Sequence, residues 1–499
     1  MFKKVLIANR GAIACRIIRT LRGMGVQSVA VYTDADSGSR HVVDADESYC
    51  IGSGVASTSY LDSDKILQVA RQSGAKAIHP GYGFLSEQAH FAERCSDQGI
   101  CFIGPTPDQM RIFGLKHSAR ELALQNQVPL LPGTGLLNDL EQALREASRI
   151  GYPVMLKSTG GGGGIGMRLC WNQDDLEGSY DSVKHLAQNN FRDGGLFLER
   201  YVEGARHIEV QIFGDGLGGV IALGERDCSL QRRNQKVIEE TPAPNLDPHL
   251  CHLMMESAIR LGRAVNYQSA GTVEYILDTH LGEFYFLEMN TRLQVEHGVT
   301  EQVTGIDLVE WMVRLSAGDL PPLDSFDIRS SGVAIQARVY AENPAKDFQP
   351  CCGVLTEARF PSSVRAETWI DRGIEVSPFY DPLLAKIIAH GSDRERAIDK
   401  LLAGLEDTEI AGIETNLDYL KRVVHSALFR SGKHSTSSLS TFPYRANTIE
   451  VIEPGVQTTV QDYPGRMGYW SVGVPPSGPM DGLAFRLANR LVNNSQDDA

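Results

Sequence analysis

Along residues 1–115, short apolar runs alternate with stretches in which apolar residues recur at helical spacing. The apolar runs are Lys4–Ala8, Val26–Thr33, Ala75–Gly83 and Ile100–Pro105. Between the first two runs, one helix face would carry Ile13, Ile17, Ile18 and Leu21. Strands that alternate with helices in this way form parallel sheets, so the pattern predicts a doubly wound α/β domain.

The pattern changes further along the chain. Residues 116–205 indicate a smaller insertion, in which a helix is followed by the strands PVMLKS, GMRLC and LFLERYV. Strand-like runs dominate residues 205–317, Pro321–Asp324 marks a boundary, and residues 330–430 are again mixed α and β. The polar stretch His434–Phe442, HSTSSLSTF, is typical of a linker, and the residues after it are too few to form a complete domain.

Composition excludes several classes of protein. The net charge of −14 argues against a general nucleic-acid binder, which needs a basic surface. No stretch approaches the roughly 20 apolar residues that cross a bilayer, and Val5–Ala8 is too short for a signal peptide. The nine cysteines are scattered and include no C-x-x-C pair, which indicates reduced thiols. We therefore expect a cytoplasmic protein without nucleic-acid or membrane partners.

A glycine run, KSTGGGGGIGM, occupies Lys157–Met167. Such a run could be a flexible linker, but the segments on both sides of it have the pattern of paired strands. Glycines at the tip of a hairpin allow backbone N–H groups to close around an anion. The order of a P-loop is absent because Lys157 precedes the glycines. The run therefore predicts a flap over phosphates, comparable with the glycine-rich loop of kinases.

The segment Glu283–His297, EFYFLEMNTRLQVEH, alternates in polarity. In an extended chain, one face would carry Phe284, Phe286, Glu288, Asn290, Arg292, Gln294 and Glu296. An amphipathic strand with a solvated face is the simpler explanation. The segment is also long for a single strand, so we expect the chain to bend before Glu296.

The preceding segment, Gly271–Leu277, suggests a hairpin. If that hairpin is symmetric about Leu281, Glu274 lies opposite Glu288, and the two carboxylates repel each other unless a cation separates them. Together with Asn290 they form an all-oxygen set suited to Mg²⁺. Glu296 near such a cation would be a suitable general base, and its alternative role is a surface salt bridge.

These features resemble the biotin carboxylase subfamily of ATP-grasp enzymes. The resemblance rests on the glycine flap, EMNTRLQVEH, HPGYGFLSE (His79–Glu87) and ERDCSLQRRNQKVIEETPAP (Glu225–Pro244), and it runs from residue 1 to about 440. It implies a multidomain α/β and α+β fold. The expected parts are an N-terminal domain with a doubly wound parallel sheet (1–115), an ATP-grasp domain (116–320) with a lid (about 130–205), and a C-terminal domain (330–442). The implied reaction is a ligase reaction, the ATP-driven carboxylation of biotin by bicarbonate through carboxyphosphate.

The resemblance also implies residue roles. ATP would contact Lys116, Lys157, Gly163, Gly164, Glu199, Arg200, Tyr201, Val202, His207, Gln231, Asn234, Glu274 and Glu288. Mg²⁺, with Mn²⁺ as an alternative, would bind Glu274, Glu288 and Asn290. Bicarbonate would be held by Lys236, Arg292, Gln294 and the Val295 backbone. Glu296 would be the base, and Arg338 would stabilise the biotin enolate, so that the catalytic set is Lys236, Arg292, Glu296 and Arg338. Taken singly, Lys116, His207 and Arg338 could each be structural.

Two positions depart from the family pattern. Arg200 stands where the family usually has lysine, which weakens the case for its adenine contact. Asn234 stands where many biotin carboxylases have histidine, and this departure narrows the subfamily. The stretches RNQKVIEETPAPN and SPFYDPLLAKIIAHG (Ser377–Gly391) look more like urea carboxylase, the carboxylating part of urea amidolyase. The tail Ile452–Asp481 resembles the start of its carboxyltransferase domain, an allophanate hydrolase subunit 2-like fold, which we expect over 449–499.

The implied partners are ATP, bicarbonate, and free biotin or a biotinylated carrier outside this chain, because the sequence contains no Met-Lys-Met attachment segment. A homodimer is implied by resemblance alone. Urea is the expected carboxyl acceptor, with guanidine, an acyl-CoA or pyruvate as alternatives. Two other classes remain open, namely an ATP-grasp ligase that joins a carboxylate to an amine, and an inactive truncated fragment.

Overall fold

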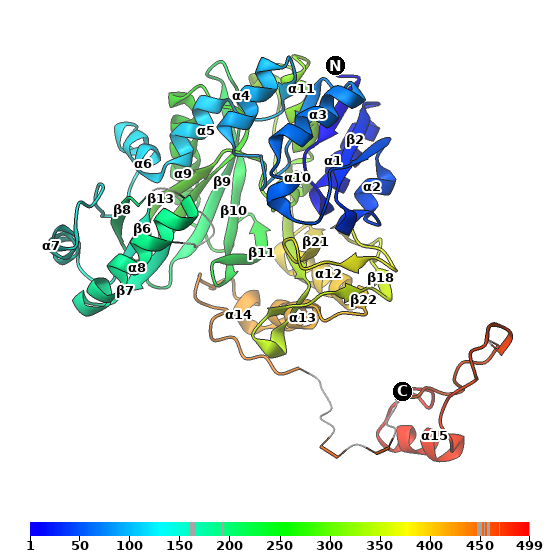
Figure 1. The fold of residues 1–499 in the computed structure, drawn as a ribbon. Helices are drawn as coiled ribbons and strands as arrows, with labels where there is room; N and C mark the ends of the chain where they lie inside the picture. The colour runs from blue at the N-terminus through cyan, green and yellow to red at the C-terminus, as the bar shows by residue number, and fades with distance from the viewer. Residues whose placement is uncertain are drawn as a thin grey trace. The chain divides into compact units, whose positions relative to one another are not determined.

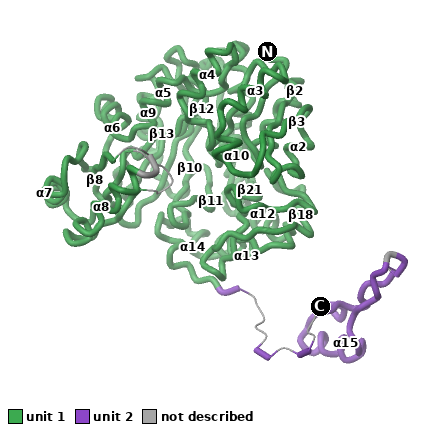
Figure 2. Tube along the Cα trace, viewed as in Figure 1, with its two compact units in different colours: residues 1–444 green, residues 445–499 purple. Residues whose placement is uncertain are grey.

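The computed structural model describes residues 1–159, 166–191, 194–446, 452–453, 455–456, 460–468 and 470–498. The chain divides into two compact units, Met1–Tyr444 and Arg445–Ala499 (Figure 2). Gly163 and Gly164 of the predicted flap lie outside the described residues.

A five-stranded parallel sheet opens the first unit, with strand order β3-β2-β1-β4-β5. It lies in the blue, N-terminal part of Figure 1, where β2 is labelled. Its strands are β1 (Lys4–Ile7), β2 (Gln27–Tyr32), β3 (Glu47–Cys50), β4 (Ala77–His79) and β5 (Cys101–Phe102). The helices are α1 (Gly11–Gly23), α2 (Arg40–Asp44), α3 (Ser63–Ser73), α4 (Ala89–Asp97) and α5 (Pro107–Gly114). The predicted doubly wound sheet is confirmed. Strand β3 was not predicted because it is only partly buried and has no apolar run.

A three-stranded antiparallel sheet, order β7-β6-β8, forms what we call the lid sheet. Its strands are β6 (Val154–Ser158), β7 (Met167–Cys170) and β8 (Leu196–Arg200), and the helices of this region are α6 (Lys116–Gln125), α7 (Leu140–Ile150) and α8 (Gln173–Phe191). Leu156 and Leu198 are fully buried in its core. Because β6 pairs with β7, the glycine run connects two hydrogen-bonded strands.

The largest sheet has eight antiparallel strands in the order β13-β12-β9-β10-β11-β14-β21-β19. They are β9 (Arg206–Asp215), β10 (Val220–Arg232), β11 (Gln235–Thr241), β12 (Gln268–Asp278), β13 (Glu283–Asn290), β14 (Val333–Tyr340), β19 (Arg365–Thr368) and β21 (Leu383–Gly391). Ile238 of β11 lies opposite Ala337 of β14. Strands predicted for the ATP-grasp and C-terminal domains therefore share one sheet, which fixes the two parts to each other.

Helices and short strands complete the first unit. The helices are α9 (Pro248–Ala264), α10 (His297–Thr304), α11 (Leu308–Ser316), α12 (Arg394–Glu406), α13 (Leu417–His425) and α14 (Ala427–Arg430). The short strands are β15 (Glu342–Asn343), β16 (Gln349–Pro350), β17 (Gly353–Val354), β18 (Glu357–Arg359), β20 (Glu375–Val376) and β22 (Glu409–Ala411). Leu401 and Leu420 are fully buried and pack α12 and α13 into the core beneath β14 and β21.

The prediction that His434–Phe442 is a linker is wrong. His434 is buried and stacks on Phe429 with ring centroids 5.8 Å apart, and Leu439 is buried in the C-terminal core. The amide of Thr436 donates to the carbonyl of Ala205 at 2.9 Å. The serine hydroxyls of this stretch bond to one another and to the local backbone, which allows a polar sequence to pack against the protein.

This packing predicts the outcome of two truncations. A chain ending at Tyr444 should unfold at the same urea concentration as the full chain, because it retains the whole first unit. A chain ending at Lys433 should lose about 2–5 kcal/mol of stability, because it removes the buried Leu439 side chain and exposes the surface below. Urea denaturation of both chains measures the difference. Equal stability would show that the segment after Lys433 behaves as a linker after all.

The second unit contains the helix α15 (Gly482–Leu491), whose first turn is capped by the Asp481 carboxylate. None of the residues of α15, all of them described, is buried. Among the described residues of the whole chain, no helix combines the length and the apolar character that spanning a bilayer would require.

Candidate active site

The hairpin of β12 and β13 brings two carboxylates face to face. Glu274 lies opposite Glu288, and Thr272 lies opposite Asn290. The predicted pairing of Glu274 with Glu288 is therefore confirmed, although pairs nearer the turn, such as Leu277–Phe284, are centred between His280 and Leu281 and not on Leu281. Strand β13 also ends at Asn290, so the chain leaves the sheet before Glu296, as its length suggested.

A β-bulge makes the predicted strict alternation of β13 wrong. The pair next to Glu274–Glu288 is Tyr275–Phe286, which leaves Leu287 as an extra residue. The bulge turns Phe286 into the core together with Tyr275, whereas Glu288 faces the cavity described below. Phe284 also packs in that core.

One cavity of about 760 Å³ gathers the predicted site residues. Every one of them within the described chain lines it, namely Lys116, Lys157, Glu199, Arg200, Tyr201, Val202, His207, Gln231, Asn234, Lys236, Glu274, Glu288, Asn290, Arg292, Gln294, Val295, Glu296 and Arg338. They come from the start of α6, from the lid sheet and the two residues after β8, from β9 to β14 with the turn between β10 and β11, and from the loop 291–296 that follows β13. Residues separated by more than 200 positions in the chain thus form one site.

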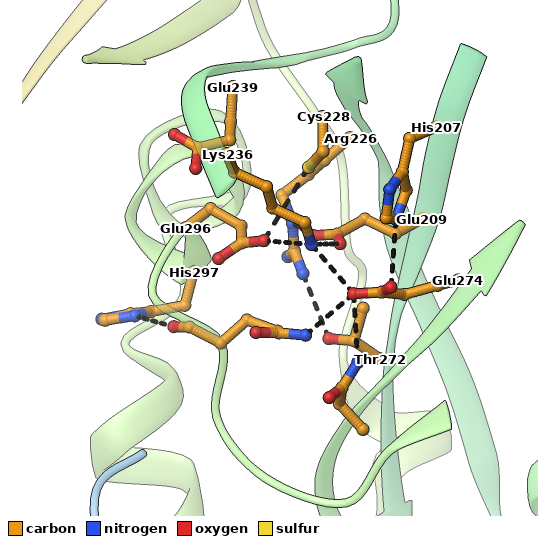
Figure 3. Close-up of polar contacts among 12 residues, drawn as sticks. His207, Glu209, Arg226, Cys228, Lys236, Glu239, Thr272, Glu274, Glu296 and His297 are labelled. Atoms are coloured by element: carbon orange, nitrogen blue, oxygen red, sulfur yellow. Dashed lines mark hydrogen bonds and ion pairs between the residues drawn. The ribbon is translucent and has the colours of Figure 1, made fainter. Parts of the chain in front are cut away.

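The ammonium group of Lys236 is the centre of a buried charge cluster (Figure 3). Its Nζ lies 2.6 Å from Glu209 Oε2, 2.8 Å from Glu274 Oε1 and 2.7 Å from Glu296 Oε1. Burial alone would lower the pKa of Lys236, but the three carboxylates outweigh it and raise that pKa well above its usual value. Lys236 is therefore charged and holds the three acidic side chains together.

Glu296 is held at both oxygens. Oε1 accepts from Lys236, and Oε2 accepts from Arg338 Nη2 at 3.0 Å. Burial alone would raise the pKa of Glu296, but Lys236, Arg338 and Arg226 hold it well below its usual range. At neutral pH the side chain is a carboxylate, which is the form that a general base requires.

The loop after β13 is fixed by Arg292. Its Nη1 donates to Gln294 Oε1 at 2.7 Å and its Nη2 to Asn290 Oδ1 at 3.0 Å, while its Nε donates to Glu87 Oε2 at 2.8 Å. Glu87 also accepts from the amide of Thr291. The motif HPGYGFLSE of the N-terminal part thus reaches the site through its last residue, which the sequence analysis did not single out.

The opposed carboxylates fit a divalent cation. Glu274 is neutralised by Lys236 and lies 3.1 Å from His207 Nε2. Within the described part of the chain, Glu288 accepts no hydrogen bond and has no ion-pair partner within 4.0 Å. Burial and the nearby Glu274 both raise the pKa of Glu288. A cation that prefers oxygen ligands, such as Mg²⁺ or Mn²⁺, would relieve this repulsion, and Asn290 lies beside the pair.

The other end of the cavity combines an apolar wall with cations. The apolar lining residues are Leu131, Met155, Met167, Phe197, Ile276 and Leu287. Lys157 and Arg120 both form ion pairs with Glu199, which is buried. Burial lowers the pKa of Lys116. An apolar slot next to positive charge matches a ligand that has a planar ring and an anionic chain.

Sequence reasoning missed several residues that support the site. Glu209 and Arg226 are fully buried, and Arg226 Nε donates to Glu209 Oε1 at 2.5 Å. A signal for Glu209 was present, because His207, Glu209 and Gln211 alternate with fully buried apolar residues along β9. Thr436 and Ser437 also line the cavity, and no sequence signal distinguished them from a linker.

Four protein-family models match the chain. They describe the biotin carboxylase N-terminal domain (residues 1–110), the carbamoyl-phosphate synthase L chain ATP binding domain (116–323), the biotin carboxylase C-terminal domain (336–441) and carboxyltransferase subdomains A and B (472–499). The last match lies within the segment for which the sequence predicted a carboxyltransferase-like start.

Individual proteins agree with these matches. Urea amidolyase from Saccharomyces cerevisiae is 54% identical over 494 residues, which are 99% of this chain and 27% of that protein. Biotin carboxylase 2 from Bacillus subtilis is 47% identical over 442 residues, which are 88% of this chain and 99% of that protein. The structure of the biotin carboxylase domain of Hydrogenobacter thermophilus 2-oxoglutarate carboxylase, with MgADP, ADP and bicarbonate, has a TM-score of 0.85 at 44% identity, covering 88% of this chain and 97% of that one.

Proposed function

Because the chain belongs to the biotin carboxylase family, we propose that it carboxylates biotin with bicarbonate in a reaction driven by ATP. One observation carries the proposal. A single cavity joins an apolar, cationic end, next to the glycine-bearing hairpin, to the cluster of Lys236, Glu296 and Arg338. Nucleotide and bicarbonate can therefore meet in one cavity, which is what phosphoryl transfer requires.

The nucleotide would occupy the apolar end. Its base would lie against Met155, Phe197 and Ile276, beside the segment Glu199–Val202, and its phosphates would extend toward Lys116 and Lys157. Glu274, Glu288 and Asn290 would hold Mg²⁺, which when bound neutralises phosphate charge in the transition state. Gly163 and Gly164 would cover the phosphates.

Bicarbonate would be held by Arg292, Lys236, Gln294 and the N–H of Val295, next to Glu296. Glu296 would accept the bicarbonate proton, and the resulting oxygen nucleophile would attack the γ-phosphorus of ATP. An O–P bond forms, the bond to ADP breaks, and carboxyphosphate and ADP result. Carboxyphosphate would release its carboxyl group as CO₂ and leave phosphate, which would take the ureido N–H proton of biotin. Arg338 would stabilise the resulting biotin enolate, whose nitrogen then forms the bond to the CO₂ carbon.

We propose urea as the final carboxyl acceptor. The 54% identity to yeast urea amidolyase and the match of residues 472–499 to a carboxyltransferase support this choice over an acyl-CoA or pyruvate. The chain spans 27% of that relative, so transfer to urea would use parts of such an enzyme that this chain does not match. Biotin would be supplied free or on a biotinylated carrier, and the reaction would take place in the cytoplasm. The chain would form a homodimer, which sedimentation analysis can measure.

ADP release tests the proposed function. The purified chain with Mg·ATP and bicarbonate should release ADP faster when free biotin is added, and omission of bicarbonate should abolish the increase. Ammonia or an amine in place of biotin tests the alternative ligase class. Stimulation by the amine and not by biotin would reject biotin carboxylation, and no stimulation by either would favour an inactive chain.

The proposed metal site predicts a shift in Mg²⁺ dependence. In Glu288→Gln, the Mg²⁺ concentration for half-maximal ADP release should rise about tenfold or more, because one anionic ligand is lost. Glu283→Gln is a matched control, since Glu283 lies on the same strand, is exposed and does not line the cavity. Identical Mg²⁺ dependence in both variants would remove Glu288 from the metal site.

A further inference from the structure

Three charged side chains form a row across the far end of the eight-stranded sheet. In the strand registers, Arg338 of β14 pairs with Lys386 of β21, and Lys386 pairs with Glu367 of β19. Directly paired residues of neighbouring strands project from the same face of a sheet. Lys386 and Glu367 are fully buried, and Arg338 is 8% exposed.

This row contacts the loop that carries the proposed base. Arg338 binds the carboxylate of Glu296, and Lys386 Nζ donates to the backbone carbonyl of Val295 at 2.7 Å. Arg338 and Lys386, which are neighbours on the sheet, thus bind Glu296 and Val295, which are neighbours in the loop. Lys386 itself does not line the cavity, so it acts on the site only from behind the loop.

The ion pair behind the loop has no evident purpose as a source of stability. Lys386 Nζ lies 2.5 Å from Glu367 Oε2. Burial lowers the pKa of Lys386; burial would also raise that of Glu367, but Lys386 and Arg365 hold it well below its usual range, so Glu367 is charged. Replacing a fully buried ion pair with apolar residues is often neutral or stabilising. The pair therefore calls for another role, and its contact with Val295 provides one.

Two hydrogen bonds orient the backbone around Val295. The carbonyl of Gln294 accepts from His297 Nδ1 at 2.7 Å, and the carbonyl of Val295 accepts from Lys386. His297, which lies next to Glu296 in Figure 3, is neutral because burial lowers its pKa well below the usual value. A trans peptide is planar, so a fixed C=O also fixes the following N–H. The first bond thereby sets the direction of the Val295 N–H, and the second sets that of the Glu296 N–H.

We propose that Lys386, held by Glu367, is a positioning residue that fixes the Val295–Glu296 peptide and, through it, the base Glu296 and the place of Val295, whose own N–H would bind bicarbonate. The inference rests on the proposed function for the role of that loop. A residue that only stabilises the fold would affect the whole cavity. Replacement of a positioning Lys386 must instead change the bicarbonate site and leave the nucleotide end of the cavity unchanged.

Kinetics of three variants test the role. In Lys386→Met, we expect the bicarbonate KM to rise about tenfold and kcat to fall about 10–100-fold, with the KM for Mg·ATP within about twofold, because small misplacements of reacting groups are costly. Lys386→Arg should recover part of the loss. In Lys386→Met, Glu367 keeps Arg365 and Arg16 as ion-pair partners, so neither this variant nor the double variant Lys386→Met/Glu367→Gln leaves an unpaired carboxylate. The kinetic defect should remain in the double variant, because Lys386 and not Glu367 contacts the loop. Recovery of the bicarbonate KM and of kcat in the double variant would overturn the proposal.

Amide hydrogen exchange tests the same role without relying on turnover. Peptides covering residues 290–298 should exchange at least about tenfold faster in the double variant than in the unmodified chain. Arg394→Met is the matched control. Arg394 of α12 also links the C-terminal part to an earlier part of the chain, because it donates to the buried carboxylate of Glu240 on β11, but it does not contact this loop. The control should leave both this exchange and the bicarbonate KM unchanged. Unchanged exchange in the double variant would overturn the proposal even if the chain proved to have a different activity.

Discussion

Replacing Glu296 with glutamine should lower biotin-dependent ADP release by about 10²–10⁴-fold, the range expected when a general base is removed. Glutamine has the same shape, and its amide oxygen can still accept a hydrogen bond from Lys236 or from Arg338, which donate to the two oxygens of the native side chain at 2.7 and 3.0 Å. It cannot take up a proton. The loss should therefore appear in kcat, with little change in the KM for Mg·ATP.

Steady-state kinetics with saturating Mg·ATP measure this effect. Glu310→Gln serves as a control for the loss of a carboxylate, because Glu310 lies on α11 outside the cavity and pairs with Arg314. If Glu296→Gln retained turnover within about threefold of the unmodified chain, proton uptake by Glu296 would be excluded.

Lys236→Met should have the second large effect, on stability as well as on turnover. The change leaves Glu209, Glu274 and Glu296 in a buried space without the cation that contacts all three. Breaking a buried ion pair by removing one partner costs about 3–5 kcal/mol. Biotin-dependent ADP release should fall below detection, because the same cation is proposed to bind bicarbonate.

The stability loss in Lys236→Met should depend on pH. In the unmodified chain Lys236 lowers the pKa of Glu274 and Glu296, so their contribution is present above the unfolded pKa of about 4.3 and is lost as pH falls below it. Without Lys236 the carboxylates repel one another, their folded pKa values rise, and protonation relieves the strain. The deficit in the free energy of unfolding should thus shrink between pH 8 and pH 5.

A second variant, Lys236→Arg, separates the effect of Lys236→Met on stability from its effect on turnover. Arginine keeps the charge and should retain most of the stability, but its planar group cannot reproduce the compact contact of an ammonium with three carboxylates. We expect a folded protein with strongly reduced turnover. A deficit for Lys236→Met that is the same at pH 5 and pH 8 would contradict the charge-cluster account.

The sequence predicted that Glu274 and Glu288 face each other, but not the reason that holds in the structure. A hairpin symmetric about Leu281 would pair them without a bulge, whereas the pairs nearer the turn are shifted by one residue and the bulge restores the Glu274–Glu288 pair. The bulge at Leu287 did not follow, because it depends on Phe286 packing into a core built from distant residues. Local periodicity cannot show which of two faces a distant core will cover.

The pattern of apolar and polar residues also could not predict which strands pair when they lie far apart in the chain. Strands β11 and β14 are separately recognisable, but their pairing, which joins two predicted domains, is decided by tertiary packing. The polar composition of His434–Phe442 predicts a linker, although Leu439 anchors this segment in the core. The family resemblance supplied most of the site residues, whereas supporting residues such as Lys386 became visible only from the contacts behind the loop.

Formation of carboxybiotin from labelled bicarbonate tests the central claim most directly. The purified chain with Mg·ATP, free biotin and ¹⁴C-bicarbonate should incorporate label into biotin in proportion to the ADP released, and Glu296→Gln should incorporate none above background. ADP release without labelled biotin, in a folded chain that binds ATP, would contradict the assignment of this cavity to biotin carboxylation.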